Sequence, residues 1–97
     1  MSRIKQVVVG RYYCVQNPGK LPGGADYLFL LVKVKRHIGR KGDFYCRFLP
    51  LDPSGEKILK GGKIKEGFCP FGRVVDGVSE GKVRKILEAS GIDPAIF

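Results

Sequence analysis

Short runs of β-branched and aromatic residues, separated by clusters of glycine and proline, follow one another along the first half of the chain. Runs of this length and composition are typical of β-strands, and the clusters between them are typical of turns. The pattern predicts three clear strands, at residues 4–16, 27–35 and 43–51. It also predicts a loop at 17–24, and weaker strands within 56–67 and 70–75, where glycine interrupts the alternation.

The hydrophobic spacing changes to a helical period near the end of the sequence. Ser79 is a good N-cap for a helix over about 79–90, and Gly91 suits the left-handed residue that often follows a helix. Three apolar positions fall on one face of this helix: Val83, Ile86 and Leu87. The sequence therefore predicts one C-terminal helix after a β-rich region.

A chain of 97 residues with 43% hydrophobic content is sufficient for one modest core. Several short strands, glycine and proline turns and one terminal helix are typical of a small, strongly bent antiparallel sheet or barrel. We therefore predict a mainly β single domain over 1–97, with the β-barrel at about 3–76. An SH3-like barrel is the leading expectation, and an OB-like barrel is the alternative.

The second and third predicted strands are expected to form a hairpin in a definite register, with Val34 opposite Phe44. Because opposed residues share a face, this register makes one face wholly apolar. The residues that then point inward are Leu30, Val32, Val34, Phe44, Cys46 and Phe48. A shift by one residue would bury unpaired charges, whereas a shift by two is compatible with the same pattern.

The outer face of this hairpin is expected to divide into two parts. Its base is apolar, through Phe29, Leu31 and Leu49, and the apolar face of the C-terminal helix is the natural cover for it. Its tip is expected to stay exposed. Basic and aromatic residues gather at the tip and in the adjoining loop: Lys33, Lys35, Arg36, Arg40, Lys41, Tyr45 and Arg47.

Positive charge is concentrated in the first half of the sequence. The chain has 18 Lys and Arg residues against 9 Asp and Glu residues, a net charge of +9. Asp26 and Asp43 are the acidic residues of the first 51 positions, whereas basic and acidic residues almost balance in the remainder. Unopposed charge of this kind causes self-repulsion that a polyanion relieves, so the composition favours a polyanionic partner.

A basic hairpin with a tyrosine among its cations suits nucleic acid. Lys and Arg side chains that meet phosphates release counterions, and an exposed tyrosine offers a flat face to an unpaired base. We therefore predict a protein that binds the phosphate backbone of DNA or RNA with low sequence specificity. Three residues extend the predicted site beyond the hairpin: Arg11, Tyr13 and Lys82. Tyr13 is expected to point outward, on the side of Arg11.

The alternative hypothesis is an interaction or sequestering module. Its basic surface would bind an acidic protein, or a small phosphorylated or cyclic nucleotide held across a dimer. A homodimer is compatible with either hypothesis, since a second copy can cover the edges of a sheet with short strands. An aromatic cage for a methylated lysine or arginine is less favoured, because a strongly cationic surface repels basic tails.

Residues with the chemistry of catalysts or metal ligands are sparse. Cys14, Cys46, Cys69 and the single histidine, His37, do not have the spacing of a zinc site, so we expect neither metal nor cofactor. The Gly77–Gly81 segment is one residue too short for a Walker phosphate-binding loop. We expect a non-enzymatic protein whose thiols pack as small apolar groups.

The sequence contains no apolar run that could cross a bilayer, which takes roughly 20 residues. The longest such run is Leu28–Val32, and the first residues lack the apolar stretch of a secretory signal. We therefore expect a soluble protein of the reducing cytoplasm that makes no membrane contact.

Overall fold

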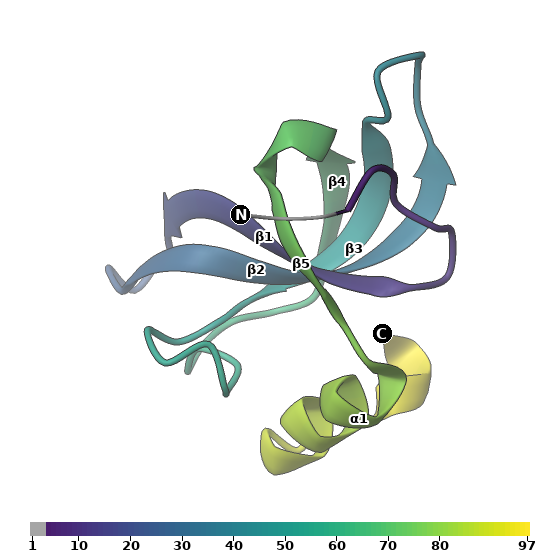
Figure 1. Ribbon diagram of the computed structural model, residues 1–97. Coiled ribbons are helices and arrows are strands. Elements are labelled where there is room, and N and C mark those ends of the chain that lie inside the picture. The colour runs from purple at the N-terminus through teal and green to yellow at the C-terminus, as the bar shows by residue number, and fades with distance from the viewer. Residues whose placement is uncertain (1–3) are drawn as a thin grey trace.

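A computed structural model describes residues 4–97 of the chain. The predicted start of the β-rich region, at residue 3, lies outside the described residues. Five strands form one antiparallel sheet in the order β4-β3-β2-β1-β5, with a helix packed against it (Figure 1). The strands are β1 (Tyr12–Lys20), β2 (Asp26–His37), β3 (Phe44–Pro50), β4 (Lys65–Cys69) and β5 (Val74–Val78).

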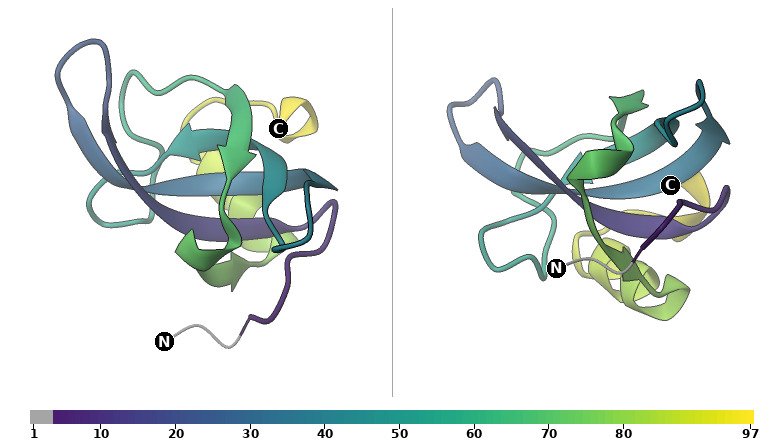
Figure 2. Two further views of the ribbon diagram at one scale, coloured as in Figure 1. Left: turned by 90° about the horizontal axis from the view of Figure 1, so that it is seen from above. Right: turned by 45° about the horizontal axis from the view of Figure 1, so that its top comes forward.

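Three helical segments follow β4. A short 3-10 turn, η1 (Phe71–Arg73), leads into β5; the helix α1 (Glu80–Ala89) comes next, and a second 3-10 turn, η2 (Pro94–Ile96), follows it. The prediction of a mainly β fold with one C-terminal helix is therefore confirmed. The sheet is not closed into a barrel, since β4 and β5 form its two edges. Figure 2 shows its strong bend, with β2 and β5 crossing at a steep angle within one sheet.

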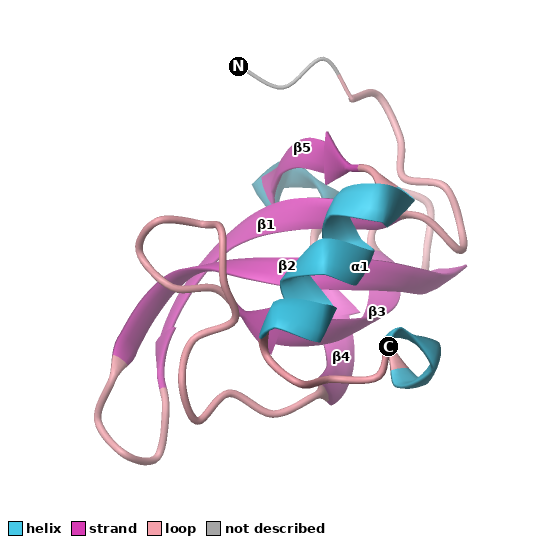
Figure 3. Ribbon diagram, turned by 90° about the horizontal axis from the view of Figure 1, so that it is seen from below, coloured by secondary structure: helices cyan, strands magenta, loops and turns pink. Residues whose placement is uncertain are grey.

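Each face of the sheet covers its own core. The inner face has a core of ten buried residues: Val7, Tyr13, Val15, Leu30, Val32, Val34, Phe44, Cys46, Cys69 and Val74. The opposite, helix-side face lies under α1 (Figure 3). Its core consists of Leu31, Leu49, Leu51, Ile58, Val83, Ile86, Leu87 and Phe97. Because β2 is covered on both faces, its central residues read as a continuous apolar run rather than an alternation.

α1 forms where the helical pattern predicted it. The Ser79 hydroxyl accepts a hydrogen bond from the backbone N–H of Lys82 at 3.2 Å. At the other end Gly91 has φ of 71°, and the backbone N–H of Ile92 donates to the carbonyl of Leu87 at 2.9 Å. These bonds satisfy backbone groups that the helix ends leave free. The apolar face of α1 covers Leu31 and Leu49, as expected.

β2 and β3 are paired two residues away from the expected register. Val34 lies opposite Cys46 rather than Phe44. A shift by two leaves every side chain on its predicted face, so the inner face of the hairpin is wholly apolar as expected. A β-bulge between Val34 and Arg36 leaves Lys35 without an opposed residue and places Arg36 opposite Tyr45.

The first strand was predicted too early in the sequence. Residues 4–11 are not a strand; they turn at Gly10, which has φ of 88°, and bury Val7 in the inner core. β1 instead begins at Tyr12 and runs through the first half of the expected 17–24 loop, to Lys20. An irregularity in its pairing with β2 accommodates Pro18, which has no N–H to donate, and the turn follows at residues 21–24.

The two weaker strands were also misplaced. β4 begins only at Lys65, near the end of the predicted 56–67 strand, and β5 begins at Val74, near the end of the predicted 70–75 strand. Most of the intervening 56–64 segment is a loop that buries Ile58 beneath the helix. Glycine made these segments ambiguous because it fits strands poorly and turns well.

Candidate nucleic-acid interface

The observed register decides which side chains meet on the helix-side face near the hairpin tip. Lys33 lies opposite Arg47, and Arg36 lies opposite Tyr45. β4 adds Glu66 opposite Arg47 and Phe68 opposite Tyr45. We call this set the helix-side cationic surface: Lys33, Lys35, Arg36, Tyr45, Arg47, Glu66 and Phe68. Its residues belong to the second half of β2, the first half of β3 and to β4. Figure 3 shows the end of β2 extending past α1.

Arg36, Tyr45 and Phe68 form a row of side chains in contact with one another. The guanidinium carbon of Arg36 lies 4.5 Å from the centroid of the Tyr45 ring. The Tyr45 ring meets that of Phe68 edge to face, with centroids 5.4 Å apart. Phe68 is 71% exposed, which is unusual for a residue of its size. The row therefore presents a cation and an accessible aromatic face side by side.

Phe68 was missed by the sequence analysis. The glycines around it obscured the alternation of β4, and the strand predicted in this region ended at residue 67, just before Phe68. Had β4 been located, Cys69 would have marked the inward positions, since it is buried in the inner core. Alternation then places Phe68 outward, beside Tyr45.

Arg47 differs from the other predicted cations of the hairpin because it already has hydrogen-bond partners. Its Nε donates to Oε2 of Glu66 at 3.0 Å, and its Nη1 donates to the carbonyl oxygen of Ile96 at 2.9 Å. Its side chain is only 25% exposed. Arg47 therefore links the sheet to the segment after α1, and its charge is largely compensated before any ligand binds.

Glu66 also affects the ionisation of its neighbours. The hydrogen bond from Arg47, and then that from Tyr45, lowers the pKa of Glu66, with a further contribution from the Lys35 charge. The same hydrogen bond to Glu66 is the main cause that raises the pKa of Tyr45. Near neutral pH Glu66 is therefore an anion within the cationic surface, and Tyr45 keeps its proton.

Lys33 lies at the border between this surface and α1. Its Nζ is 5.7 Å from the centroid of the Tyr12 ring, which stacks on Phe97 with centroids 6.0 Å apart. Lys33 also lines a hollow of about 280 Å³ together with Glu80, Arg84 and Asp93. The charges of that hollow are mixed, so Lys33 is less isolated from carboxylates than the sequence suggested.

Arg40 and Lys41 are exposed in the hairpin loop between β2 and β3. Neither forms an ion pair within residues 4–97. The loop is closed by the backbone N–H of Ile38, which donates to the carbonyl of Asp43 at 2.8 Å. The Asp43 carboxylate in turn accepts from the backbone N–H of Phe71 at 3.1 Å. The base of the loop is thus tied to η1, while its two cations remain accessible.

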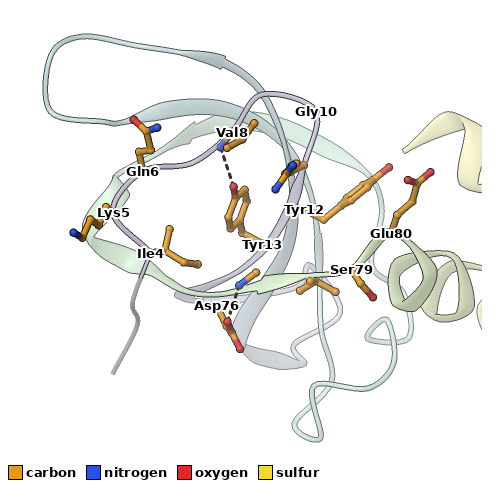
Figure 4. Close-up of a pocket in the computed structure, with 13 residues that line it drawn as sticks. Ile4, Lys5, Gln6, Val8, Gly10, Tyr12, Tyr13, Asp76, Ser79 and Glu80 are labelled. Atoms are coloured by element: carbon orange, nitrogen blue, oxygen red, sulfur yellow. Dashed lines mark hydrogen bonds between the residues drawn. The ribbon is translucent and has the colours of Figure 1, made fainter.

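Tyr13 is not an outward stacking residue, contrary to the prediction. It is 6% exposed in the inner core, and its hydroxyl oxygen accepts a hydrogen bond from the backbone N–H of Val8 at 2.8 Å (Figure 4). The reason is its position opposite Val32, which places it on the inner face. Tyr12, its neighbour, is the tyrosine that faces the helix side.

The remaining predicted residues, Arg11 and Lys82, have carboxylates in their surroundings. Arg11 lines a hollow of about 790 Å³ that also includes Lys5, Asp76 and Glu80, so its surroundings carry both signs of charge. Figure 4 shows the last three residues around this hollow. Lys82 is on α1, where its Nζ is 3.6 Å from a carboxylate oxygen of Glu56. The backbone of Arg11 is a neighbour of the hairpin, since its carbonyl accepts a hydrogen bond from the N–H of Val34 at 3.0 Å. Lys82 belongs to α1 instead.

The three cysteines are free thiols. Burial is the main cause that raises the pKa of Cys46 to about 12 and that of Cys69 to about 11, and it also raises the pKa of Cys14. The thiols therefore remain protonated near neutral pH. Among the described residues no group of three or more His, Cys, Asp or Glu side chains is placed to hold a metal ion.

Comparisons of the chain with protein families, with curated proteins and with solved structures found no match. Within residues 4–97 no helix has the length and apolar character needed to span a membrane. Function is therefore inferred from the geometry of this chain.

Proposed function

We propose that the protein binds DNA or RNA through the helix-side cationic surface, with little readout of base sequence. The main observation is the row of Arg36, Tyr45 and Phe68, in which a guanidinium and an exposed aromatic ring lie together. Phosphates suit the cations, and an unpaired base suits the ring, where stacking contributes about 1–3 kcal/mol per base. Single-stranded segments are the preferred substrate in this proposal, because a paired base has no free face to offer.

Within this proposal we assign the fold to the SH3-like class rather than the OB-like class. Strands β1 to β4 pair in sequence order, and β5 returns to pair with β1. The 3-10 turn η1 joins β4 to β5. That order and connection support an SH3-like arrangement, whereas an OB-like barrel is a closed or partly open Greek key.

The structure leaves fewer cations for phosphate than the sequence offered. Arg47 and Lys82 have carboxylate partners. The cations that remain near the hairpin are Lys33, Lys35, Arg36, Arg40 and Lys41. If about four of them contact phosphate, the logarithm of the association constant falls with the logarithm of salt concentration at a slope of about −3 to −4.

The test is a fluorescence anisotropy titration of labelled single-stranded and double-stranded oligonucleotides at several salt concentrations. We expect tighter binding to single strands and the slope given above. Replacement of Lys35 and Arg36 by Glu, two exposed cations of the surface, is expected to weaken binding on the order of a hundredfold or more. An affinity that does not depend on salt would contradict the proposal.

A matched control is available on the same chain. Lys57 and Lys85 are exposed cations that lie outside the cationic surface, and their replacement by Glu changes the net charge by the same amount. We expect this control pair to lose far less affinity than the Lys35 and Arg36 pair. Equal losses would show that only the total charge matters and that the surface has no special role.

The alternative, a module that binds an acidic protein, predicts a different purification result. A nucleic-acid-binding protein is expected to carry heterogeneous nucleic acid, with excess absorbance at 260 nm that nuclease removes. A clean protein that retains one acidic partner would favour the alternative. The chain has no Trp, so the absorbance ratio is judged against the low baseline of its four Tyr residues.

A further inference from the structure

A cavity of about 450 Å³ opens at the end of the sheet opposite the hairpin tip. Its floor is apolar and belongs to the start of β2 and the end of β3: Tyr27, Leu30, Phe48 and Pro50. Four lysines surround this floor: Lys20, Lys60, Lys63 and Lys65. None of its described lining residues is acidic. The volume lies within the range of small-molecule sites, which is about 300–1,000 Å³.

The floor is an accessible part of the inner core. Tyr27 and Phe48 are partly buried residues packed against that core, and Leu30 belongs to it. Both residues line this cavity, so a ligand in it can meet aromatic rings of the inner face. A flat, apolar ligand group would extend the packing that is already present there.

Two glycines give the cavity its shape. Gly19 lies opposite Tyr27 in the β1–β2 pairing, and a Cβ at Gly19 would collide with the Tyr27 ring. A Cβ at Gly62 would come within 2.6 Å of the Pro50 ring. The tyrosine ring and the 60–64 loop therefore take these positions only because the two glycines leave room for them.

The lysines around the cavity are largely free of carboxylate partners. Nζ of Lys20 lies 3.6 Å from Oδ1 of Asp26. The two side chains are 65% and 79% exposed, so this ion pair is weak. The other three lysines form no ion pair within residues 4–97. Four ammonium groups around an apolar floor attract an anion. The ligand that fits both features has a flat apolar part and a phosphate or similar anionic group.

We propose that this cavity binds one nucleotide unit, with its base against Tyr27 and Phe48 and its phosphate among the lysines. The unit is either a free mononucleotide or one nucleotide of a single strand. The site is separate from the helix-side cationic surface, since it lies on the inner face. Arg36 also follows Tyr27 by nine positions along β2, which corresponds to about 30 Å of extended strand at about 3.3 Å per residue. The proposal does not depend on nucleic-acid binding at that surface.

The experiment is an amide chemical-shift titration of the full chain with AMP and, separately, with a short oligothymidylate. Adenosine, ribose 5-phosphate and inorganic phosphate are the matched partial ligands. We expect AMP to shift the amides of Tyr27, Phe48 and the 60–65 segment, and adenosine and ribose 5-phosphate to bind on the order of tenfold more weakly. If only the oligothymidylate shifts these amides, the source of the nucleotide is a single strand.

Variants separate this cavity from the helix-side cationic surface. Lys60→Glu with Lys63→Glu is expected to abolish the AMP shifts, whereas Lys35→Glu with Arg36→Glu leaves them unchanged. Both pairs are exposed, and the dispersion of the amide spectrum checks that each variant is folded. The proposal is overturned if no ligand shifts the cavity amides. It is also overturned if inorganic phosphate binds as well as AMP, because the aromatic floor would then contribute nothing.

Discussion

Glu66 limits the positive charge that the helix-side cationic surface offers to a ligand. Its carboxylate accepts a hydrogen bond from Arg47, and its charge lies near Lys35. The hydroxyl of Tyr45 also donates a hydrogen bond to the Glu66 carboxylate. A single acidic residue therefore influences three of the residues that the sequence assigned to nucleic acid.

Glu66→Gln is expected to strengthen nucleic-acid binding. Loss of the carboxylate removes a negative charge that repels phosphate. It also removes the ion pair with Arg47, so the Arg47 charge becomes available for one more phosphate contact. The salt slope should steepen by about 0.7–0.9. Anisotropy titrations at several salt concentrations measure both effects. Glu88→Gln is the control, because it removes one exposed carboxylate from α1 outside this surface; an equal gain in both variants would contradict the role of Glu66.

The same carboxylate predicts a pH dependence of stability. Because the pKa of Glu66 is lower in the folded protein than its ordinary value of 4.5, its ionised form favours the folded state. This stabilisation is present above pH 4.5 and is lost as the pH falls through the folded-state pKa. The Tm difference between the native protein and Glu66→Gln, measured by circular dichroism, should therefore shrink in acid. A difference that stays constant down to pH 3 would show that ionisation is not its cause.

At the scale of elements, the contact between α1 and the sheet determines the second core. Leu87 is among the largest fully buried side chains, and it packs with Leu31 and Leu49 of the sheet. The short strands alone would leave this face of the sheet exposed to water. The helix is therefore part of the fold and not an appendage to it.

Leu87→Ala is expected to destabilise the protein by about 2–5 kcal/mol, through lost burial and the cavity that the smaller side chain leaves. Chemical denaturation followed by circular dichroism measures the change. Lys85→Ala on the exposed side of the same helix is the control and should change stability little. A Leu87→Ala variant as stable as that control would mean that α1 does not cover the sheet in solution.

The β-bulge of β2 determines which side chains lie opposite each other on the helix-side cationic surface. Without it, Arg36 and Tyr45 would not be opposed, and Lys35 would take a regular position in the strand. The predicted register lacked the bulge because alternation of apolar residues ends at Val34, so nothing in the local pattern marks where pairing becomes irregular. The row of Arg36, Tyr45 and Phe68 in the proposed interface thus depends on an irregularity that hydrophobicity alone does not reveal.

At the scale of the whole molecule, charge is distributed differently in space and along the sequence. The second half of the chain is nearly balanced in charge, yet Lys60, Lys63 and Lys65 gather with Lys20 around one cavity. Conversely, Arg47 from the strongly basic first half is compensated by Glu66 of the second half. Groups of cations therefore lie at two places, on the hairpin and around this cavity.

This excess charge should make the free protein more stable at moderate salt. Self-repulsion is screened as the Debye length falls from about 30 Å at 0.01 M salt to about 10 Å at 0.1 M. We expect Tm to rise over this range, in contrast to nucleic-acid affinity, which falls. Thermal melts at increasing sodium chloride concentration measure this rise in Tm, and an uncharged osmolyte at equal osmolality is the control. A Tm that falls with salt would contradict the expectation.

The sequence by itself determined the properties that depend on neighbouring residues. Alternation assigned the side chains of β2 and β3 to their correct faces, and Ser79 and Gly91 marked the ends of the helix, because strand faces and helix caps are set locally.

The tertiary structure alone decided the properties that depend on contacts between distant residues. These include the two-residue shift in register, the engagement of Arg47 by Glu66 and Ile96, and the burial of Tyr13 instead of Tyr12. The tertiary structure also brings lysines from separate segments together around one cavity. Strand pairing and chain bending bring such residues together, and short-range patterns carry no record of which distant segment becomes a neighbour.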